Sequence, residues 1–218
     1  MRRGWLAVTG AALAAGLALL SVAPAHAAER KPVTILLASL PVGPEHVGGY
    51  ERSLFRHWID ADRNGCDTRR EVLIAEAIAG QSVGCDVPGG AWLSFYDGVR
   101  TEDPATFDID HMIPLKEAWD SGAFRWTPAT RTAFANDLSY PAALVAVTAS
   151  SNRSKGDQDP ATWEPAQGRC RYAKSWIAVK FRWRLSVDTA EKAALQRMLQ
   201  GCPLLVVVPQ LADTQTSS

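Results

Sequence analysis

The sequence contains no long apolar run after residue 22 and no two cysteines in Cys-x-x-Cys spacing. Without such a run, the chain after residue 22 has no segment able to span a bilayer, because a spanning helix needs about 20 consecutive apolar residues. The second absence disfavours a zinc site built on cysteines. The sequence also has no internal repeat, which disfavours solenoids and other repeat architectures.

An excess of charge of either sign is also missing. The chain has 23 Lys and Arg residues and 23 Asp and Glu residues. Loss of Arg2 and Arg3 with an N-terminal peptide would leave 21 basic and 23 acidic residues, a formal charge of −2. Residues 166–187, however, contain six basic residues, four aromatic residues and no acidic residue. This segment indicates a local surface that attracts phosphate, with the solvated face of an amphipathic helix as the alternative.

The first 28 residues have the pattern of a secretory signal peptide. Arg2 and Arg3 precede an apolar run over residues 5–22, and Ala25-His26-Ala27 follows it. A charged start, an apolar middle and a small-residue ending are typical of such peptides. We therefore expect cleavage after Ala27 and a secreted, extracellular mature protein without membrane attachment. A membrane anchor is the alternative, because about 18 apolar residues nearly span a bilayer.

The remaining residues suit one domain in length. We expect a lead-in segment over residues 28–48, a single domain over 49–210 and a loose polar tail over 211–218. The sequence does not indicate an oligomeric state.

Four cysteines remain after residue 27, and an even number in an exported protein favours two disulfides. Three pairings exist. We prefer Cys66 with Cys85 and Cys170 with Cys202, because each pair brackets one compact helical unit. Loops of this size would contribute on the order of 3 kcal/mol each.

Apolar periodicity and turn signals predict an α+β fold that is rich in helices and has a small antiparallel sheet. The expected helices are 49–59, 70–78, 115–119, 128–138, 172–184 and 189–199. The expected strands are 107–110, 144–148 and one that enters a turn within 89–98. Asp188 and Glu191 are expected to cap the last helix reciprocally.

Two short segments carry most of the chemistry. Residues 107–114 read Phe-Asp-Ile-Asp-His-Met-Ile-Pro, and residues 151–157 read Ser-Asn-Arg-Ser-Lys-Gly-Asp. A nuclease needs a base for the attacking water and a cation near the leaving oxygen, because a phosphodiester repels nucleophiles and has a poor leaving group. His111 can act as the base, and Asp110 with Asn152 can hold a divalent ion. Lys155, one helical turn after Asn152, is expected to hold a phosphate oxygen.

Adjacent strand residues point to opposite faces, so Asp110 and His111 share one site only if the strand bends there. Pro114 is consistent with such a break. His57 has no partner at ligand spacing, and we interpret it as a structural histidine.

The two segments resemble the HNH, or ββα-metal, endonucleases. The shared pattern is Asp-His-x-x-Pro, a connecting segment, an apolar strand at 144–147 and Asn-x-x-Lys-Gly from Asn152, and it covers residues 107–165. Further motifs at 64–69, 96–98, 117–123 and 151–163 are similar to secreted bacterial proteins of the HNH endonuclease family, which is related to the nuclease domain of Gmr-type restriction enzymes.

This resemblance implies a ββα-metal core over residues 107–165 and a metal-dependent endonuclease. It implies that His111 is the general base and that Asp110 and Asn152 hold one ion. We count Lys155 as a further catalytic residue because of its expected contact with a phosphate oxygen. Oxygen ligands favour magnesium or manganese. The substrate would be nucleic acid, DNA first, cut with little sequence preference to leave a 5′ phosphate.

The sequence departs from the family at one signature position. Ala143 stands where the family has a middle asparagine that helps to orient the histidine. We expect Asp108 or Asn136 to take over that role, and reduced activity is the alternative. The paired cysteines that hold zinc in some members are also missing.

Residues 60–71 fit the template of a calcium-binding loop, with Gly65 at its glycine position. Oxygen donors stand at four key positions of that template: Asp60, Asp62, Asn64 and Glu71. The loop would hold calcium as a second, structural ion. Asp67 stands where an apolar residue usually packs, which favours the alternative of a polar turn between helices.

Basic residues outside the two segments are expected to contact the nucleic-acid backbone. With Arg153 they form the set Arg69, Arg153, Lys174, Lys180, Arg182 and Arg184. The competing interpretation is a non-catalytic exported module that binds nucleic acid or a cell surface. A hydrolase of another phosphodiester would use the same residues.

Overall fold

The computed structural model describes residues 1, 28–80, 82, 84–87 and 89–217. The expected signal peptide therefore lies outside the described residues, apart from Met1. The described chain forms seven α-helices, three 3-10 turns and six short strands, which pair in three two-stranded antiparallel sheets. The expected mixed α+β class with small antiparallel sheets is confirmed. No helix in this part of the chain is long and apolar enough to cross a membrane.

The sheet at the centre of the fold pairs β4 (Phe107–His111) with β5 (Leu144–Thr148). The register runs from Phe107 opposite Thr148 to His111 opposite Leu144. Every residue of β5 is buried, which explains why its sequence is a continuous apolar run instead of an alternating one. The sheet separates two apolar cores: Val145 and Val147 belong to the larger one, Ile109 and Ala146 to the smaller one.

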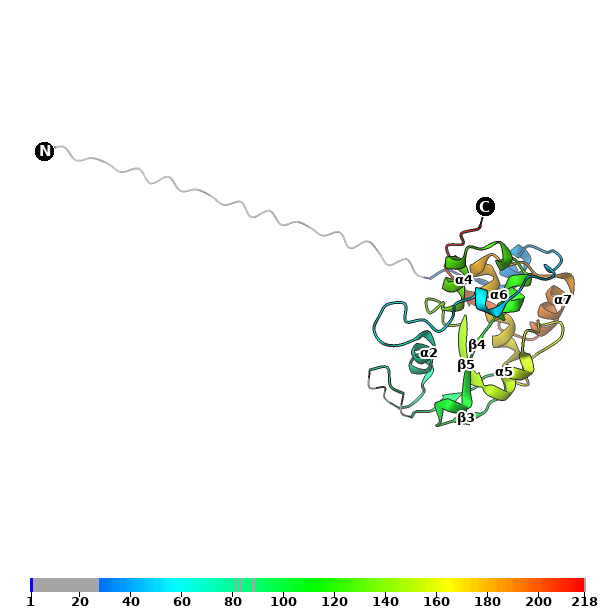
Figure 1. The fold of residues 1–218 in the computed structure, drawn as a ribbon. Coiled ribbons are helices and arrows are strands. Elements are labelled where there is room, and N and C mark those ends of the chain that lie inside the picture. Colours follow the sequence, from blue (N-terminus) through cyan, green and yellow to red (C-terminus); the bar gives the residue numbers. More distant parts are fainter. Residues whose placement is uncertain (2–27, 81, 83, 88, 218) are drawn as a thin grey trace.

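The helices cover both faces of this sheet (Figure 1). On the side of the smaller core lies α2 (Thr68–Glu76), together with the β2–β3 hairpin (Trp92–Leu93 and Arg100–Thr101). The other side carries α5 and the long buried helix α6, which packs against α1 and α7. Their bounds, with those of the two remaining helices, are α1 Val33–Ser39, α3 Leu115–Asp120, α4 Pro128–Ala135, α5 Ala149–Lys155, α6 Arg169–Trp183 and α7 Thr189–Met198.

Helix α5 follows β5 without a loop. Thr148, the last residue of β5, accepts a hydrogen bond on its side chain from the amide of Ser151 and so caps the helix. The helix ends at Gly156, whose φ of 53° lies in the left-handed region that favours glycine. This direct turn from strand to helix places residues 152 and 155 over β4.

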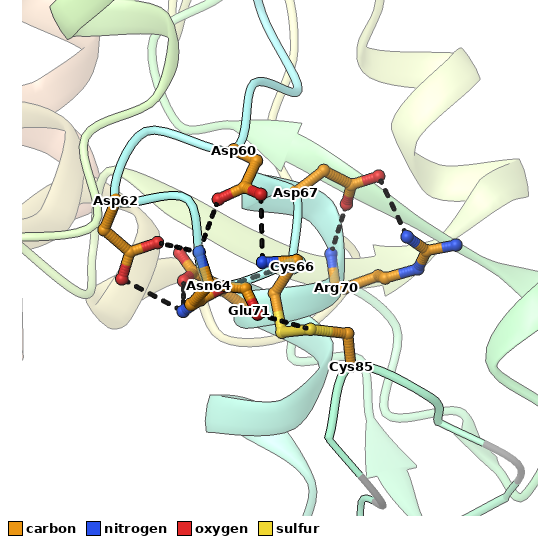
Figure 2. The surroundings of a disulfide bond; sticks show 9 residues. Asp60, Asp62, Asn64, Cys66, Asp67, Arg70, Glu71 and Cys85 are labelled. Carbon is orange, nitrogen blue, oxygen red and sulfur yellow. Dashed lines mark hydrogen bonds and ion pairs between the residues drawn. A yellow bond between two sulfur atoms is a disulfide. The ribbon is translucent and has the colours of Figure 1, made fainter.

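Both expected disulfides are confirmed. Cys66 is bonded to Cys85, and Cys170 at the start of α6 is bonded to Cys202 after α7. The first bond lies at the end of the polar loop 60–66 (Figure 2). The cap of α7 is confirmed in one direction: Asp188 accepts from the amide of Glu191, while the Glu191 side chain turns into the core.

The helix expected over residues 49–59 is wrong. Only Arg52–Leu54 form a short 3-10 turn, η1, and the rest is irregular. The apolar spacing that suggested a helix has another origin: Tyr50 and Leu54 pack on the larger core, whereas Trp58 packs on the smaller one. One segment thus bridges two cores, which an α-helix of this length would not do.

The lead-in and the tail are both ordered in the described chain, although we expected the tail to be loose. In the lead-in, β1 (Arg30–Pro32) pairs with β6 (Leu205–Val207), and α1 buries three side chains. The tail expected to be loose is hydrogen-bonded: Gln215 O accepts from the amide of Thr127 and the hydroxyl of Thr130. We expected a loose tail because local composition shows that the tail is polar but cannot show its hydrogen-bond partners, which are distant in the sequence.

Candidate active site

A cavity of about 210 Å³ lies at the end of β4, where the strand runs into α3. It brings together Asp110, His111 and Asn152, the three residues that the sequence pattern assigned to one site. Its other lining residues are Arg52, Ile109, Pro114, Leu115, Arg153, Gly156 and Asp157. Asp110 and His111 therefore share one cavity although they are neighbours on a strand.

The spacing of the two elements explains how the polar side chains meet. Asp108 and Asp110 are two residues apart on β4 and so share one face, while Asn152 and Lys155 are three apart on α5 and share one side of that helix. Asn152 Nδ2 donates to Asp108 Oδ2 over 3.1 Å. Lys155 Nζ donates to Asp110 Oδ1 and Oδ2 over 2.9 and 2.7 Å.

Lys155 is not free to hold a phosphate, contrary to our expectation. Its side chain is 0% exposed and binds Asp110 and the carbonyl oxygen of His111, the latter over 2.8 Å. Tyr96 completes the cluster by donating its hydroxyl to Asp110 Oδ2 over 2.6 Å. Burial raises the pKa of Asp110 and lowers that of Lys155, and the attraction between them opposes both shifts. Because α5 packs directly on the sheet, the amine lies against the carboxylate and partly offsets the rise in the pKa of Asp110.

His111 is held by a backbone carbonyl and an aromatic ring. Its Nε2 lies 2.9 Å from the carbonyl oxygen of Ala135, at the end of α4. Since a carbonyl can only accept, Nε2 carries the hydrogen and Nδ1 is the basic nitrogen. The ring stacks on Trp58 with a centroid distance of 5.3 Å and an interplanar angle of 30°. Burial lowers the pKa of His111 to about 3, so the imidazole is neutral and able to accept a proton at neutral pH.

The two residues expected to orient His111 have other partners. Asp108 accepts a hydrogen bond from the side-chain amide of Asn152. Asn136 accepts from the amide of Ile59 and donates to the carbonyl of Arg56, which ties α4 to the loop that carries Trp58. Ala143 contributes a backbone carbonyl to the amide of Met112. The Ala135 carbonyl takes the orienting role; nothing in the sequence singles out that atom.

The site fits a hard divalent ion in its donor atoms. Asp110 Oδ1 accepts one hydrogen bond and retains a lone pair, and Asn152 Oδ1 has no hydrogen-bond partner among the described residues. Carboxylate and amide oxygens suit magnesium and manganese. Because Lys155 neutralises Asp110, the affinity would be lower than that of a site with two free carboxylates.

Comparison with known proteins gives two matches. Residues 92–198 match the family described as GmrSD restriction endonucleases, C-terminal domain. An uncharacterized secreted protein of the fungus Arthroderma benhamiae is 45% identical over 165 residues, which cover 74% of this chain and 79% of that protein. This chain belongs to the family of that secreted protein, and its residues 92–198 are similar to the GmrSD C-terminal domain. This relative is fungal, so the expected relationship to secreted bacterial proteins stays a prediction. No solved structure matches the chain significantly.

Two residues in or next to the cavity precede the residues that match the GmrSD family. Arg52 lines the cavity and Trp58 stacks on His111, and both precede the matched residues. The sequence interpretation missed both because it assigned the segment to a helix. Trp58 adopts a φ of 56°, a left-handed conformation that is costly for a bulky side chain.

Helix α6, which lies within the matched residues, does not present the expected basic surface. Lys180 is 0% exposed between Glu117 and Glu191, at 2.6 and 2.7 Å, and Arg182 is bound to Asp137 at 2.7 Å. The nucleic-acid role expected for Lys180 and Arg182 is therefore wrong. Local sequence could not show this, because the acidic partners come from other elements.

The other basic candidates are placed differently. Arg184 donates to the carbonyl of Ala212, and Arg69 donates to the carbonyl of Phe107 over 3.0 Å. Lys174 is half-buried on α6 and lines a different cavity. Arg153 alone among the six lines the active-site cavity, with a side chain 79% exposed.

Hydrogen bonds among its own residues hold the proposed calcium loop together (Figure 2). Asp60 accepts from the amides of Asn64 and Gly65 over 3.1 and 2.9 Å. The side-chain amide of Asn64 donates to Asp62 and Glu71, over 3.0 Å in each case. These contacts describe a stable polar turn, and calcium binding stays a prediction.

The buried cluster of Lys180, Glu117 and Glu191 makes the free energy of unfolding depend on pH. Burial raises the pKa of Glu117 to about 8. The folded protein then keeps a proton that the unfolded chain releases near pH 4.5, so the free energy of unfolding should fall as pH rises between these values. Glu117→Gln should remove this pH-dependent part of the free energy of unfolding. Between pH 4.5 and about 8, the difference in the free energy of unfolding between variant and wild type should therefore change by up to about 1.4 kcal/mol per pH unit. Urea unfolding at pH 5.5, 7 and 8.5 measures the difference, and a difference independent of pH would contradict the assignment.

Proposed function

We propose that this protein is an exported, metal-dependent endonuclease whose β4, β5 and α5 form a ββα-metal core. The observation that carries the proposal is the shared cavity of His111, Asp110 and Asn152. The GmrSD match supports a nuclease-like function and nucleic acid as the substrate. DNA is the substrate we propose first.

The reaction would be hydrolysis of a phosphodiester. Nδ1 of the neutral His111 would accept a proton from water as the water oxygen bonds to phosphorus and the bond to the 3′ oxygen breaks. Asp110 and Asn152 would hold the ion, magnesium or manganese, whose charge would stabilise the leaving oxygen. Lys155 and Tyr96 would fix the position of the Asp110 carboxylate, and Asp108 would fix the amide of Asn152.

The extracellular location is supported by two findings. The similar fungal protein is described as secreted, and the described chain contains two disulfides and no free cysteine. Disulfides persist mainly in oxidising compartments. We propose that residues 1–27 are removed on export. The remaining chain is then a single domain that includes β1 and α1 and so begins before residue 49, where we had expected it to start.

Cleavage of supercoiled plasmid by the mature, disulfide-bonded protein tests this function. Nicking is expected with magnesium or manganese and is expected to stop with EDTA. Folded protein that binds plasmid without cutting it under any ion would contradict the proposal and favour a non-catalytic module. Cleavage of bis(p-nitrophenyl) phosphate but not of DNA or RNA would favour another phosphodiester.

A further inference from the structure

Arg52 is a cation of the active-site cavity that the proposed reaction does not yet use. It belongs to η1, 59 residues before His111 in the sequence, and it lies outside the matched GmrSD domain. Its side chain is exposed and lines the same cavity as Asp110, His111 and Asn152.

The surroundings of Arg52 leave its charge available. Within the described part of the chain, it forms no ion pair with a carboxylate, whereas Arg153 on the same cavity lies 3.9 Å from Asp108.

A cation without a carboxylate partner would give the cavity a positive charge that can attract a substrate. Lys155 is committed to Asp110, so this pair contributes no net charge toward a substrate. A phosphodiester carries one negative charge, and a guanidinium binds phosphate oxygens through two parallel hydrogen bonds. Arg52 is the exposed cavity residue with this capacity and without a competing carboxylate among the described residues.

We infer that Arg52 contacts a backbone phosphate of the nucleic acid bound in this cavity, from the segment that precedes the GmrSD domain. The inference rests on the proposed function for the identity of the ligand. It makes residues 50–58 part of the site, with Arg52 as a substrate contact and Trp58 as the support of His111. A GmrSD domain without this segment would bind its substrate more weakly.

Binding of a fluorescein-labelled 12-base-pair duplex DNA to the mature protein in EDTA tests the inference. Arg52→Ala should weaken binding about tenfold, the usual scale of a charge-assisted hydrogen bond. The slope of log affinity against log salt should fall by about 0.9, as expected for one lost phosphate contact. Arg52→Lys should retain the slope while recovering only part of the affinity, because the fork of the guanidinium is lost.

Arg56→Ala is the matched control. Arg56 is exposed on the same segment but does not line the cavity, so the variant loses an equal charge outside the site. Equal effects of the two alanine variants, or no effect of Arg52→Ala, would overturn the inference. If the wild type cuts plasmid and Arg52→Ala binds DNA normally, only this inference is contradicted and the proposed function stands. Protein that never cuts but binds DNA through Arg52 would remove only the endonuclease proposal.

Discussion

His111→Ala is expected to lower plasmid cleavage by about 10²- to 10⁴-fold, the usual contribution of a general base. The imidazole is neutral because burial lowers its pKa to about 3, and its Nε2 is committed to the carbonyl of Ala135. A proton can therefore be accepted on Nδ1. The cleavage rate of the wild type, measured from pH 5 to 9, should show no loss from protonation of this residue, because that loss would begin only near pH 3.

His57→Ala is the matched control for this variant. The ring of His57 lies 6.2 Å from that of His111, and its Nδ1 donates a hydrogen bond to the carbonyl oxygen of Phe55 instead of reaching the cavity. Its replacement should leave cleavage within a few fold of the wild type. His111→Ala protein that is folded by circular dichroism and cuts at the wild-type rate would disprove the assigned base. Loss of activity at pH 6 to 7 in the wild type would instead indicate another base.

Lys155→Met is expected to be the most destabilising single change in the site. It leaves the Asp110 carboxylate buried without a counter-charge, and breaking a buried pair on one side costs about 3–5 kcal/mol. For a chain of this length the melting temperature should fall by about 10 °C. The loss should shrink in acid, because an unpaired buried carboxylate binds a proton more readily and then carries no charge.

The double variant Asp110→Asn/Lys155→Met separates charge from packing. Removing both charges should recover a large part of the lost stability, since no uncompensated charge is left, while cleavage stays lost. The double-mutant cycle, measured by urea unfolding with the disulfides intact, gives the coupling energy of the pair. A single variant as stable as the wild type would show that the pair does not support the fold. A double variant no better than the single one would assign the loss to packing.

Much of the site could be predicted from local sequence. The pairing of β4 with β5 follows from two apolar strands, and the approach of Asn152 to β4 follows from the helix that begins directly after β5. The disulfides followed from an even cysteine count and compact spacing. These inferences held because each depends on residues close in sequence, where periodicity and turn chemistry dominate.

The roles of the charged residues could not be predicted in this way. Lys155 and Lys180 read as phosphate ligands because basic residues usually stay in solvent, yet both are fully buried. Both lysines can be buried only because distant segments supply carboxylates that pair with them. Asp110 is 45 residues from Lys155, and Glu117 is 63 residues from Lys180. A sequence window does not contain such partners.

The sequence by itself determined the donor atoms of the site, the α+β class and the covalent cross-links. Tertiary structure alone decided which cations face the cavity, which carbonyl orients His111, and that Arg52 and Trp58 join the site. The physical reason is that donor identity is a property of single residues. The burial, pairing and orientation of a side chain depend on the packing of segments that are far apart in the chain.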